Sequence, residues 1–186
     1  DGAVACDHFH RFEEDLDLLV DAGFDAYRFS FSWSRLFPDG KNLNIKGLDF
    51  YKQLLDAINS RGLRPFGTAY HWDMPQALGA LGGWTMRDNA ERFGEYMGFI
   101  ARNFGENLEN LVSINEPWCV AWLSHYLGVH APGLKDIEST AKAMHYIMLA
   151  HGYGMEVIRS YSFKNAGIVL NKAAVESYSD KPEDID

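Results

Sequence analysis

A carboxylate and an amide stand at the end of a short apolar run, in Asn115-Glu116-Pro117-Trp118, and these residues are well placed to do chemistry. The run before them, from Leu111 to Ile114, is apolar or small, which is typical of a strand buried on both faces. Pro117 has no backbone N–H to donate, so we expect the strand to end at Glu116. A buried carboxylate costs free energy unless it is neutral, paired or catalytic. Glu116 is therefore the first candidate for an acid or base.

Other polar and aromatic side chains stand at the ends of segments that have the pattern of strands. The predicted strands are Ala26 to Trp33, Pro65 to Tyr70, Leu111 to Glu116 and Ala166 to Leu170. The side chains at or just after their ends are Trp33, His71, Trp72, Asn115, Glu116 and Asn171. In the first strand, alternation places Arg28 on one face with Ser30 and Ser32. That polar face requires a cleft or a barrel interior to accept it.

Amphipathic segments separate these strands. Apolar residues at helical spacing predict helices near Arg11 to Ala22, Leu48 to Gly62, Ala90 to Phe104 and Ala141 to Ile158. Gly152 and Gly154 weaken the prediction that the last helix is unbroken. The glycine-rich segment from Gly79 to Trp84 and the acidic tail from Asp180 to Asp186 predict loops. Strands and helices that alternate in this way require parallel strands joined by right-handed crossovers, which is the α/β class.

The spread of the polar side chains favours a (β/α)8 barrel over an open doubly wound sheet. A barrel collects side chains from the carboxyl ends of all its strands, whereas a doubly wound sheet concentrates its site at one switch point. The sequence has no Gly-x-Gly-x-x-Gly turn to mark such a point. Barrels use eight units in typically ~250 residues, and this chain has 186 residues. We therefore expect residues 1–186 to be one domain, part of a barrel with about four strand and helix units, incomplete at both ends.

Composition excludes several classes of partner. The net charge is -9 at pH 7, and the 17 Lys and Arg residues form no basic stripe, which argues against nucleic acid and anionic membranes. No apolar run approaches the ~18 residues of a membrane span. Cys6 and Cys119 are far apart beside apolar neighbours, which favours reduced thiols in the core and a reducing, cytoplasmic compartment. The sequence does not indicate an oligomeric state.

Several short motifs occur together along the chain. They are Ala5-Cys6-Asp7-His8-Phe9-His10-Arg11, Tyr27-Arg28-Phe29-Ser30, Tyr70-His71-Trp72-Asp73-Met74-Pro75, Gly82-Gly83-Trp84, Asn115-Glu116-Pro117-Trp118, His130-Ala131-Pro132-Gly133 and Leu149-Ala150-His151. In this order and spacing, the chain resembles the β-glucosidases of glycoside hydrolase family 1, most like bacterial members. The set is more specific than Asn-Glu-Pro alone, which recurs across related barrel glycosidases. The resemblance implies that the four strands are the second to the fifth of a (β/α)8 barrel.

The resemblance implies a retaining β-glycosidase that needs no cofactor and removes terminal β-D-glucosyl residues from β-glucosides or cello-oligosaccharides. Such enzymes use two carboxyl groups ~5–5.5 Å apart, one as acid/base and one as nucleophile. By the resemblance, Glu116 is the acid/base, and Arg28 keeps the nucleophile ionised through charge-assisted hydrogen bonds. The substrate-binding residues that it implies are His71, Trp72 and Asn115 toward the glycon, and Trp118 and Asn171 toward the aglycone.

The sequence departs from the family in two places. The family's nucleophile lies in a Glu-Asn-Gly motif that is absent here, and Glu109-Asn110 is followed by Leu111. The glutamine of the family's first strand, before Ala5-Cys6-Asp7-His8, is also missing. We therefore expect a fragment that does not hydrolyse glycosides by itself.

Two alternatives belong to other functional classes. One is a non-catalytic carbohydrate-binding or pseudoenzyme remnant of the same fold. The other is a metal-dependent hydrolase, which His8-Phe9-His10 suggests because histidines one residue apart on a strand can ligate zinc. Here the pair opens a predicted helix, where residues two apart face different ways. A structural role for both histidines is therefore favoured, and no metal site is expected.

Overall fold

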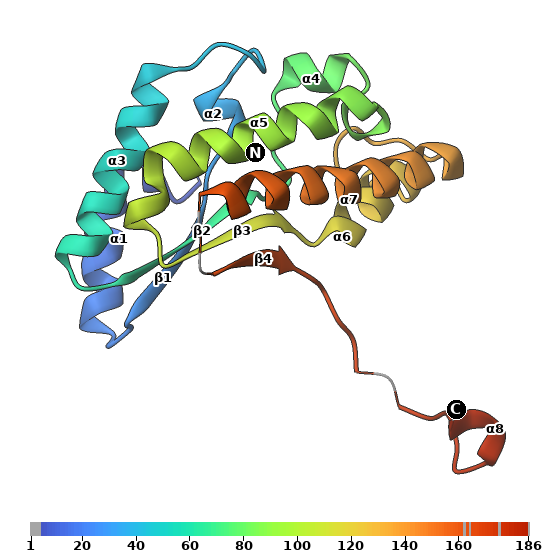
Figure 1. Cartoon of the computed structure of the whole chain (residues 1–186). Helices are drawn as coiled ribbons and strands as arrows, with labels where there is room; N and C mark the ends of the chain where they lie inside the picture. The colour runs from blue at the N-terminus through green and yellow to red at the C-terminus, as the bar shows by residue number, and fades with distance from the viewer. Residues whose placement is uncertain (1–4, 162, 164, 175, 186) are drawn as a thin grey trace.

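A four-stranded parallel sheet forms the centre of the computed structural model, which describes residues 5–161, 163, 165–174 and 176–185 (Figure 1). The strands are β1 (Ala26–Ser30), β2 (Arg64–Tyr70), β3 (Asn110–Asn115) and β4 (Ala166–Val169), and they lie in the sheet in chain order. One row across the sheet pairs Phe29 with Gly67, Gly67 with Leu111, and Leu111 with Ala166. The parallel pairing confirms the predicted α/β class.

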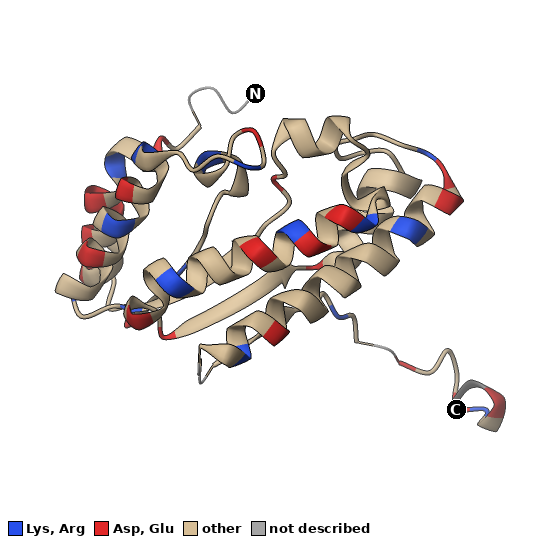
Figure 2. Ribbon diagram, turned by 45° about the horizontal axis from the view of Figure 1, so that its top comes forward, with Lys and Arg blue, Asp and Glu red and all other residues tan. Residues whose placement is uncertain are grey.

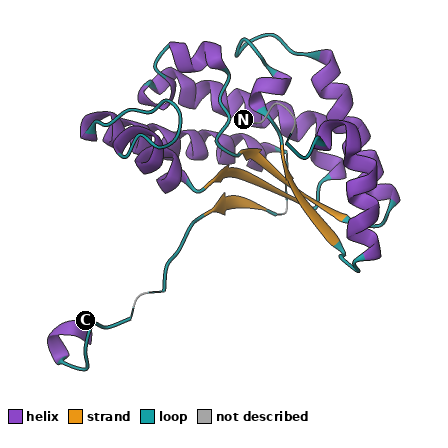
Figure 3. Cartoon of the chain, turned by 180° about the vertical axis from the view of Figure 1, so that it is seen from behind, coloured by secondary structure: helices purple, strands orange, loops and turns teal. Residues whose placement is uncertain are grey.

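The helices lie mainly on one side of the sheet, as Figure 3 shows from behind. They are α1 (His8–Asp21), α2 (Trp33–Leu36), α3 (Ile45–Ser60), α4 (Gln76–Ala80), α5 (Arg87–Phe104), α6 (Pro117–Ala121), α7 (Ile137–Ser160) and α8 (Pro182–Ile185). Three short turns add η1 (Gly83–Thr85), η2 (Gly105–Asn107) and the π-helical η3 (Trp122–Tyr126). The segment after β4 leaves the sheet and carries α8 away from the helices (Figure 1).

Aromatic side chains fill the core between the sheet and the helices. Trp33 stacks on Tyr96 of α5, with 5.0 Å between ring centroids and 12° between planes. Phe31 stacks on Phe104 at 5.0 Å. The outward side of α5 is charged instead: Figure 2 shows acidic and basic residues interspersed along it, with Arg87 Nε 3.6 Å from a carboxylate oxygen of Glu91. The amphipathic helix thus buries one stripe and exposes the other.

Glycines let α5 and α7 lie close together. A Cβ on Gly94 would meet Cβ of Tyr153 at 3.0 Å, and a Cβ on Gly154 would meet Cγ of Met97 at 2.9 Å. Helix α7 is continuous from Ile137 to Ser160, so the predicted long helix is confirmed and its two glycines do not interrupt it. Packing against α5 and β3 offsets the low helix propensity of glycine.

Three predicted strands end earlier than expected, and the fourth of the chain stops at Val169, one residue before the predicted Leu170. The first stops at Ser30 rather than Trp33, because the hydroxyl of Ser32 accepts a hydrogen bond from the Arg35 N–H and caps α2. Ser32 therefore does not share a strand face with Arg28. The third stops at Asn115, because Glu116 adopts a left-handed backbone that cannot continue a strand.

Three further expectations need correction. The glycine-rich segment contains helical turns, since α4 and η1 both fall in or beside it. The acidic tail contains α8, and its last residue, Asp186, lies outside the described residues. Both cysteines are free thiols, but only Cys119 is buried, because Cys6 lies in an exposed turn before α1. Within the described part of the chain, no helix is both long and apolar enough to cross a membrane.

Candidate active site

Glu116 lies at the junction between β3 and α6. Its backbone has φ 51° and ψ 68°, a left-handed conformation that is unusual for a residue other than glycine. Its N–H donates to the carbonyl of Val169 on β4 at 2.8 Å, and Pro117 begins α6 directly after it. The Glu116 carboxylate is half-buried and accepts a hydrogen bond from the Cys119 thiol, with Sγ 3.2 Å from Oε2. The junction therefore holds both the backbone and the side chain of this residue.

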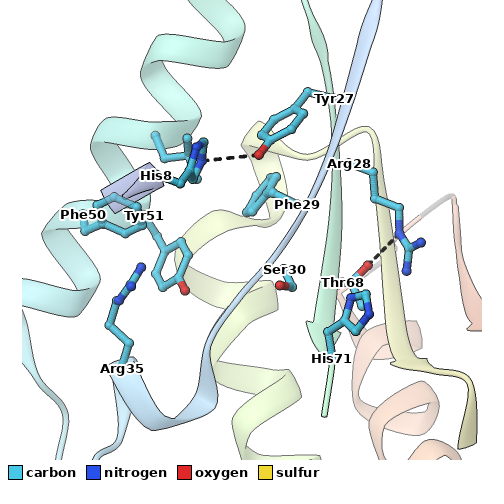
Figure 4. A pocket seen from close by; sticks show the side chains of 11 residues that line it. His8, Tyr27, Arg28, Phe29, Ser30, Arg35, Phe50, Tyr51, Thr68 and His71 are labelled. Atoms are coloured by element: carbon cyan, nitrogen blue, oxygen red, sulfur yellow. Dashed lines mark hydrogen bonds between the residues drawn. The ribbon is translucent and has the colours of Figure 1, made fainter. Parts of the chain in front are cut away.

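Arg28 bridges the three strands beside this junction. From β1, its Nε donates to Oγ1 of Thr68 on β2 at 3.0 Å, as Figure 4 shows. Its Nη2 donates to Oδ1 of Asn115 on β3 at 2.7 Å. Asn115 is only 3% exposed, so a charged donor satisfies an amide oxygen that would be costly to bury alone. The guanidinium thus fixes the residue that precedes Glu116.

His71 and Trp72 follow β2 and reach the same place. The indole Nε1 of Trp72 donates to the backbone carbonyl of Asn115 at 2.9 Å. Trp72 also has a positive φ of 79°. Burial lowers the pKa of His71, the charge of Arg28 lowers it further, and the charge of Glu116 opposes both. The imidazole is therefore neutral at pH 7 and can both donate and accept a hydrogen bond.

Trp118 and Asn171 lie together at a separate cavity. Trp118, in α6, is 44% exposed and stacks on Trp122, with ring centroids 5.9 Å apart and 18° between planes. Both Trp118 and Asn171 line a cavity of about 410 Å³, whose apolar wall includes Met144 and Met148 of α7. An exposed indole face beside such a cavity can stack on an apolar ring.

Two other cavities adjoin the site. One of about 300 Å³ is lined by Arg28, His71 and Thr68 together with residues of α1 and α3 (Figure 4). The other, of about 880 Å³, is lined by Trp72 and by His130. The hydrogen bonds thus bring Arg28, Trp72 and Asn115 together beside Glu116. The other contacts are divided among three cavities: Arg28 and His71 line one, Trp72 lines the second, and Trp118 and Asn171 line the third.

Several residues in this region were not predicted as part of the site. Thr68 positions Arg28, and Cys119 contacts Glu116. The ring of His130 lies 5.1 Å from that of Trp72. Cys119 stands three residues after Glu116, which is one helical turn, so a prediction of α6 would have indicated it. His130 stands in one of the motifs quoted above, but nothing in its local pattern indicates contact with Trp72.

The two histidines of His8-Phe9-His10 are engaged by acidic residues of their own segment. Nδ1 of His8 lies 2.6 Å from a carboxylate oxygen of Asp15, and Nδ1 of His10 lies 2.7 Å from one of Asp7. Nε2 of His8 also lies 3.3 Å from the hydroxyl of Tyr27. Among the described residues, no group of three or more His, Cys, Asp or Glu side chains is arranged to hold a metal ion.

Comparison with known proteins identifies the family to which this arrangement belongs. The profile of the family described as glycosyl hydrolase family 1 matches residues 1–186. The chain belongs to glycosyl hydrolase family 1. A β-glucosidase of Agrobacterium sp. is 46% identical over 186 residues, which are 99% of this chain and 40% of the relative. β-Glucosidase A of Thermotoga maritima is 44% identical, over 99% of this chain and 42% of the relative.

Solved structures share the fold of this chain. The family 1 β-glucosidase from Thermotoga maritima superposes with a TM-score of 0.93 at 44% identity, over 98% of this chain and 42% of that one. The complex of the virulence factor SghA with its substrate analog salicin has a TM-score of 0.93 at 45% identity, over 99% and 41% of the two chains. The four strands are therefore part of a (β/α)8 barrel, as predicted. This family 1 chain spans about two fifths of the length of these relatives.

Proposed function

We propose that this chain supplies the acid/base half of the active site of a retaining β-glycosidase that releases terminal β-D-glucosyl residues from β-glucosides and cello-oligosaccharides. One observation carries the proposal: Glu116 follows β3 directly, beside an Asn115 amide that Arg28 holds at 2.7 Å. The relatives support the substrate class. SghA binds the substrate analog salicin, and the Thermotoga maritima β-glucosidase binds deoxynojirimycin.

Glu116 acts in both halves of the proposed reaction. It first donates a proton to the glycosidic oxygen while a second carboxylate attacks the anomeric carbon and forms a glycosyl-enzyme intermediate. It then takes a proton from the water that hydrolyses this intermediate. The bond to the aglycone breaks in the first step, and the bond to the nucleophile breaks in the second.

The neighbouring residues bind and orient the sugar in this proposal. The neutral ring of His71 hydrogen-bonds glycon hydroxyls, and the indole of Trp72, whose N–H already bonds the Asn115 carbonyl, contacts the glycon through its ring. Because Oδ1 of Asn115 accepts from Arg28, the amide nitrogen is the group left to donate to the sugar 2-hydroxyl. Two of the five N–H groups of Arg28 are used on Thr68 and Asn115, and others remain to hold an ionised nucleophile.

The aglycone occupies the cavity beside Trp118 and Asn171. The indole face stacks on a sugar or aryl ring, and the amide of Asn171 offers a polar contact at the rim. The Met144 and Met148 side chains add an adaptable apolar wall.

The second carboxyl group lies outside this chain in our proposal. The sequence has no Glu-Asn-Gly motif, and retaining hydrolysis requires both carboxyl groups. We therefore expect the 186-residue polypeptide alone to show no turnover of p-nitrophenyl β-glucoside. Steady release of p-nitrophenol by this polypeptide would contradict that expectation.

A chimera tests the role of Glu116 directly. Residues 1–186 replace the matching stretch of the Thermotoga maritima enzyme, and hydrolysis of cellobiose and of p-nitrophenyl β-glucoside is measured. We expect Glu116→Gln to lower kcat/KM for cellobiose by a factor of ~10²–10⁴. The loss in the first step should be smaller for the nitrophenyl glucoside, because nitrophenolate leaves without a proton.

Glu109→Gln is the matched control, since Glu109 precedes the opposite end of the same strand and its N–H bonds the carbonyl of Pro65. Equal losses in the two variants would refute the acid/base assignment. An unaffected Glu116→Gln chimera would likewise refute it. A parent chimera that binds cellobiose without hydrolysing it would favour a remnant that only binds carbohydrate, because the exposed indoles of Trp72 and Trp118 need no nucleophile to bind a sugar.

A further inference from the structure

The side chain of Glu116 is held in an unusual way for the residue that precedes a helix. A residue at this N-cap position commonly accepts a hydrogen bond from a backbone N–H of the first turn, but the side chain of Glu116 makes no such bond. Its Oε2 instead accepts from the thiol of Cys119, the third residue of α6, at 3.2 Å. Cys119 is only 8% exposed and belongs to a helix that Pro117 begins.

We propose that Cys119 is a positioning residue for Glu116, whose thiol hydrogen bond sets the direction of the carboxyl group at the end of β3. This inference rests on the proposed acid/base role of Glu116. A glutamate side chain has several rotatable bonds and loses conformational entropy when it is ordered. A donor that is itself fixed in a buried helix narrows the rotamers that the carboxyl group visits. An acid must hold its proton near one oxygen of the substrate, so this restriction favours reaction.

The other charged groups near Glu116 do not orient its carboxyl group. His71, from the segment after β2, experiences the charge of Glu116, and Arg28, from β1, donates to Asn115 and Thr68. Among the hydrogen bonds of the described residues, the one from Cys119 is the only side-chain bond that reaches the carboxyl group of Glu116. The thiol is therefore the local group that can select its orientation.

The thiol keeps its proton under ordinary conditions. Burial raises the pKa of Cys119 to about 11, and the hydrogen bond and charge of Glu116 contribute to the increase. A thiolate beside the carboxylate would lose the donor and repel the neighbouring charge. Cys119 therefore acts as a neutral donor at neutral pH and undergoes no covalent step.

A thiol titration tests the contact from the cysteine side. In a Cys6→Ser background, Cys119 is the one thiol of the chain, and the ultraviolet absorbance of its thiolate gives its pKa. Glu116→Gln removes the negative charge and should lower this pKa by about 1 unit. Glu109→Gln, before the other end of β3, should leave it unchanged. An unchanged pKa in the Glu116→Gln variant would overturn the proposal.

The carbon-13 shift of the Glu116 carboxyl group tests the contact from the other side. At neutral pH, Cys119→Val fills space without a donor and should move this signal, whereas Cys119→Ser keeps a donor and should return it toward the original shift. Equal shifts in the valine and serine variants would mean that Cys119 only packs against Glu116.

Circular dichroism establishes that each variant is folded. If a Cys119 variant does not fold, the thiol titration of the Glu116→Gln variant still tests whether Cys119 contacts Glu116. Neither measurement depends on turnover, so an inactive chimera would count against the proposed function and leave this inference separately testable.

Discussion

Two glycines of α7, only two positions apart, should respond differently to the same substitution. Gly154 is buried against α5, and an added Cβ would stand 2.9 Å from Cγ of Met97. Gly152 is exposed, and an added Cβ would meet nothing within 4 Å. Neither residue has a positive φ, so alanine fits the backbone at both positions. The pair therefore separates the effect of helix propensity from the effect of packing.

The expected magnitudes follow from these contacts. Alanine is more favourable than glycine inside a helix by about 1 kcal/mol, and this gain is common to both positions. Overpacking at Gly154 costs about 1–3 kcal/mol, because Cγ of Met97 lies near the base of its side chain and cannot swing away as a terminal methyl could. Gly152→Ala should therefore raise the free energy of unfolding by about 1 kcal/mol. The free energy of unfolding of the Gly154→Ala protein should lie about 1–3 kcal/mol below that of the Gly152→Ala protein.

Urea unfolding followed by circular dichroism measures this difference. With an m-value of about 2 kcal/mol/M, a difference of about 2 kcal/mol separates the two midpoints by roughly 1 M. Equal midpoints, or a Gly154→Ala protein more stable than Gly152→Ala, would refute the close approach of α5 and α7. An altered m-value in one variant would indicate a changed denatured or native state rather than a packing cost.

The packing of α7 matters for the site because this helix contacts β3. Nδ1 of His151 lies 2.8 Å from Oγ of Ser113, and that hydroxyl donates to the carbonyl of Gly167 on β4 at 3.0 Å. Ser113 is two residues before Asn115. If α7 moves away from α5 to accommodate a new methyl group, the backbone that carries Asn115 and Glu116 should move with it. We expect the Gly154→Ala chimera to lose more activity than the Gly152→Ala chimera.

Three substitutions or treatments test other parts of the region. Arg28→Met should lower the free energy of unfolding by about 2 kcal/mol in urea, because the buried Asn115 amide loses a charged donor; no change would contradict that contact. Burial lowers the pKa of His125, so the unfolded chain binds its proton first, and stability should fall as the pH drops below about 6.5. His125→Asn should reduce that fall between pH 7.5 and 5.5, and an identical pH dependence would refute the assignment. Ellman's reagent should react quickly with exposed Cys6 and slowly with Cys119, whose pKa is raised to about 11, and two equally fast thiols would contradict this burial.

The order of strands and helices could be predicted because it depends on periodic burial. Alternation in β1 and helical spacing in α5 report which side faces the core, and the structure confirms both elements. The ends of the strands were less predictable, because single capping interactions determine them. Ser32 leaves the strand to cap α2, and nothing in the apolar pattern distinguishes it from Ser30.

The site could be predicted as far as parallel strands bring their carboxyl ends together. That rule places His71 and Asn115 in one region. Arg28 was assigned to the site by the family resemblance, and the structure joins it directly to Asn115, 87 positions away. The contact of Cys119 with Glu116 was missed because α6 was not predicted. Proline at the first position of a helix is a known signal, but Pro117 indicated only the end of a strand in the sequence pattern.

Two residues of the proposed site have a strained backbone. Among the described residues, the non-glycine residues with positive φ are Ala5, Asp7, Trp72 and Glu116. Ala5 and Asp7 lie before α1, but the other two follow neighbouring strands and meet through Asn115, whose carbonyl accepts from the Trp72 indole. Each such conformation costs about 1–3 kcal/mol and persists only where surrounding bonds determine it. At this site the Glu116 N–H donates to β4 and the Trp72 indole donates to Asn115. Arg28 holds Asn115 in turn. Two strained residues thus follow the ends of neighbouring strands. This strain supports a functional role for Glu116 independently of its sequence motif.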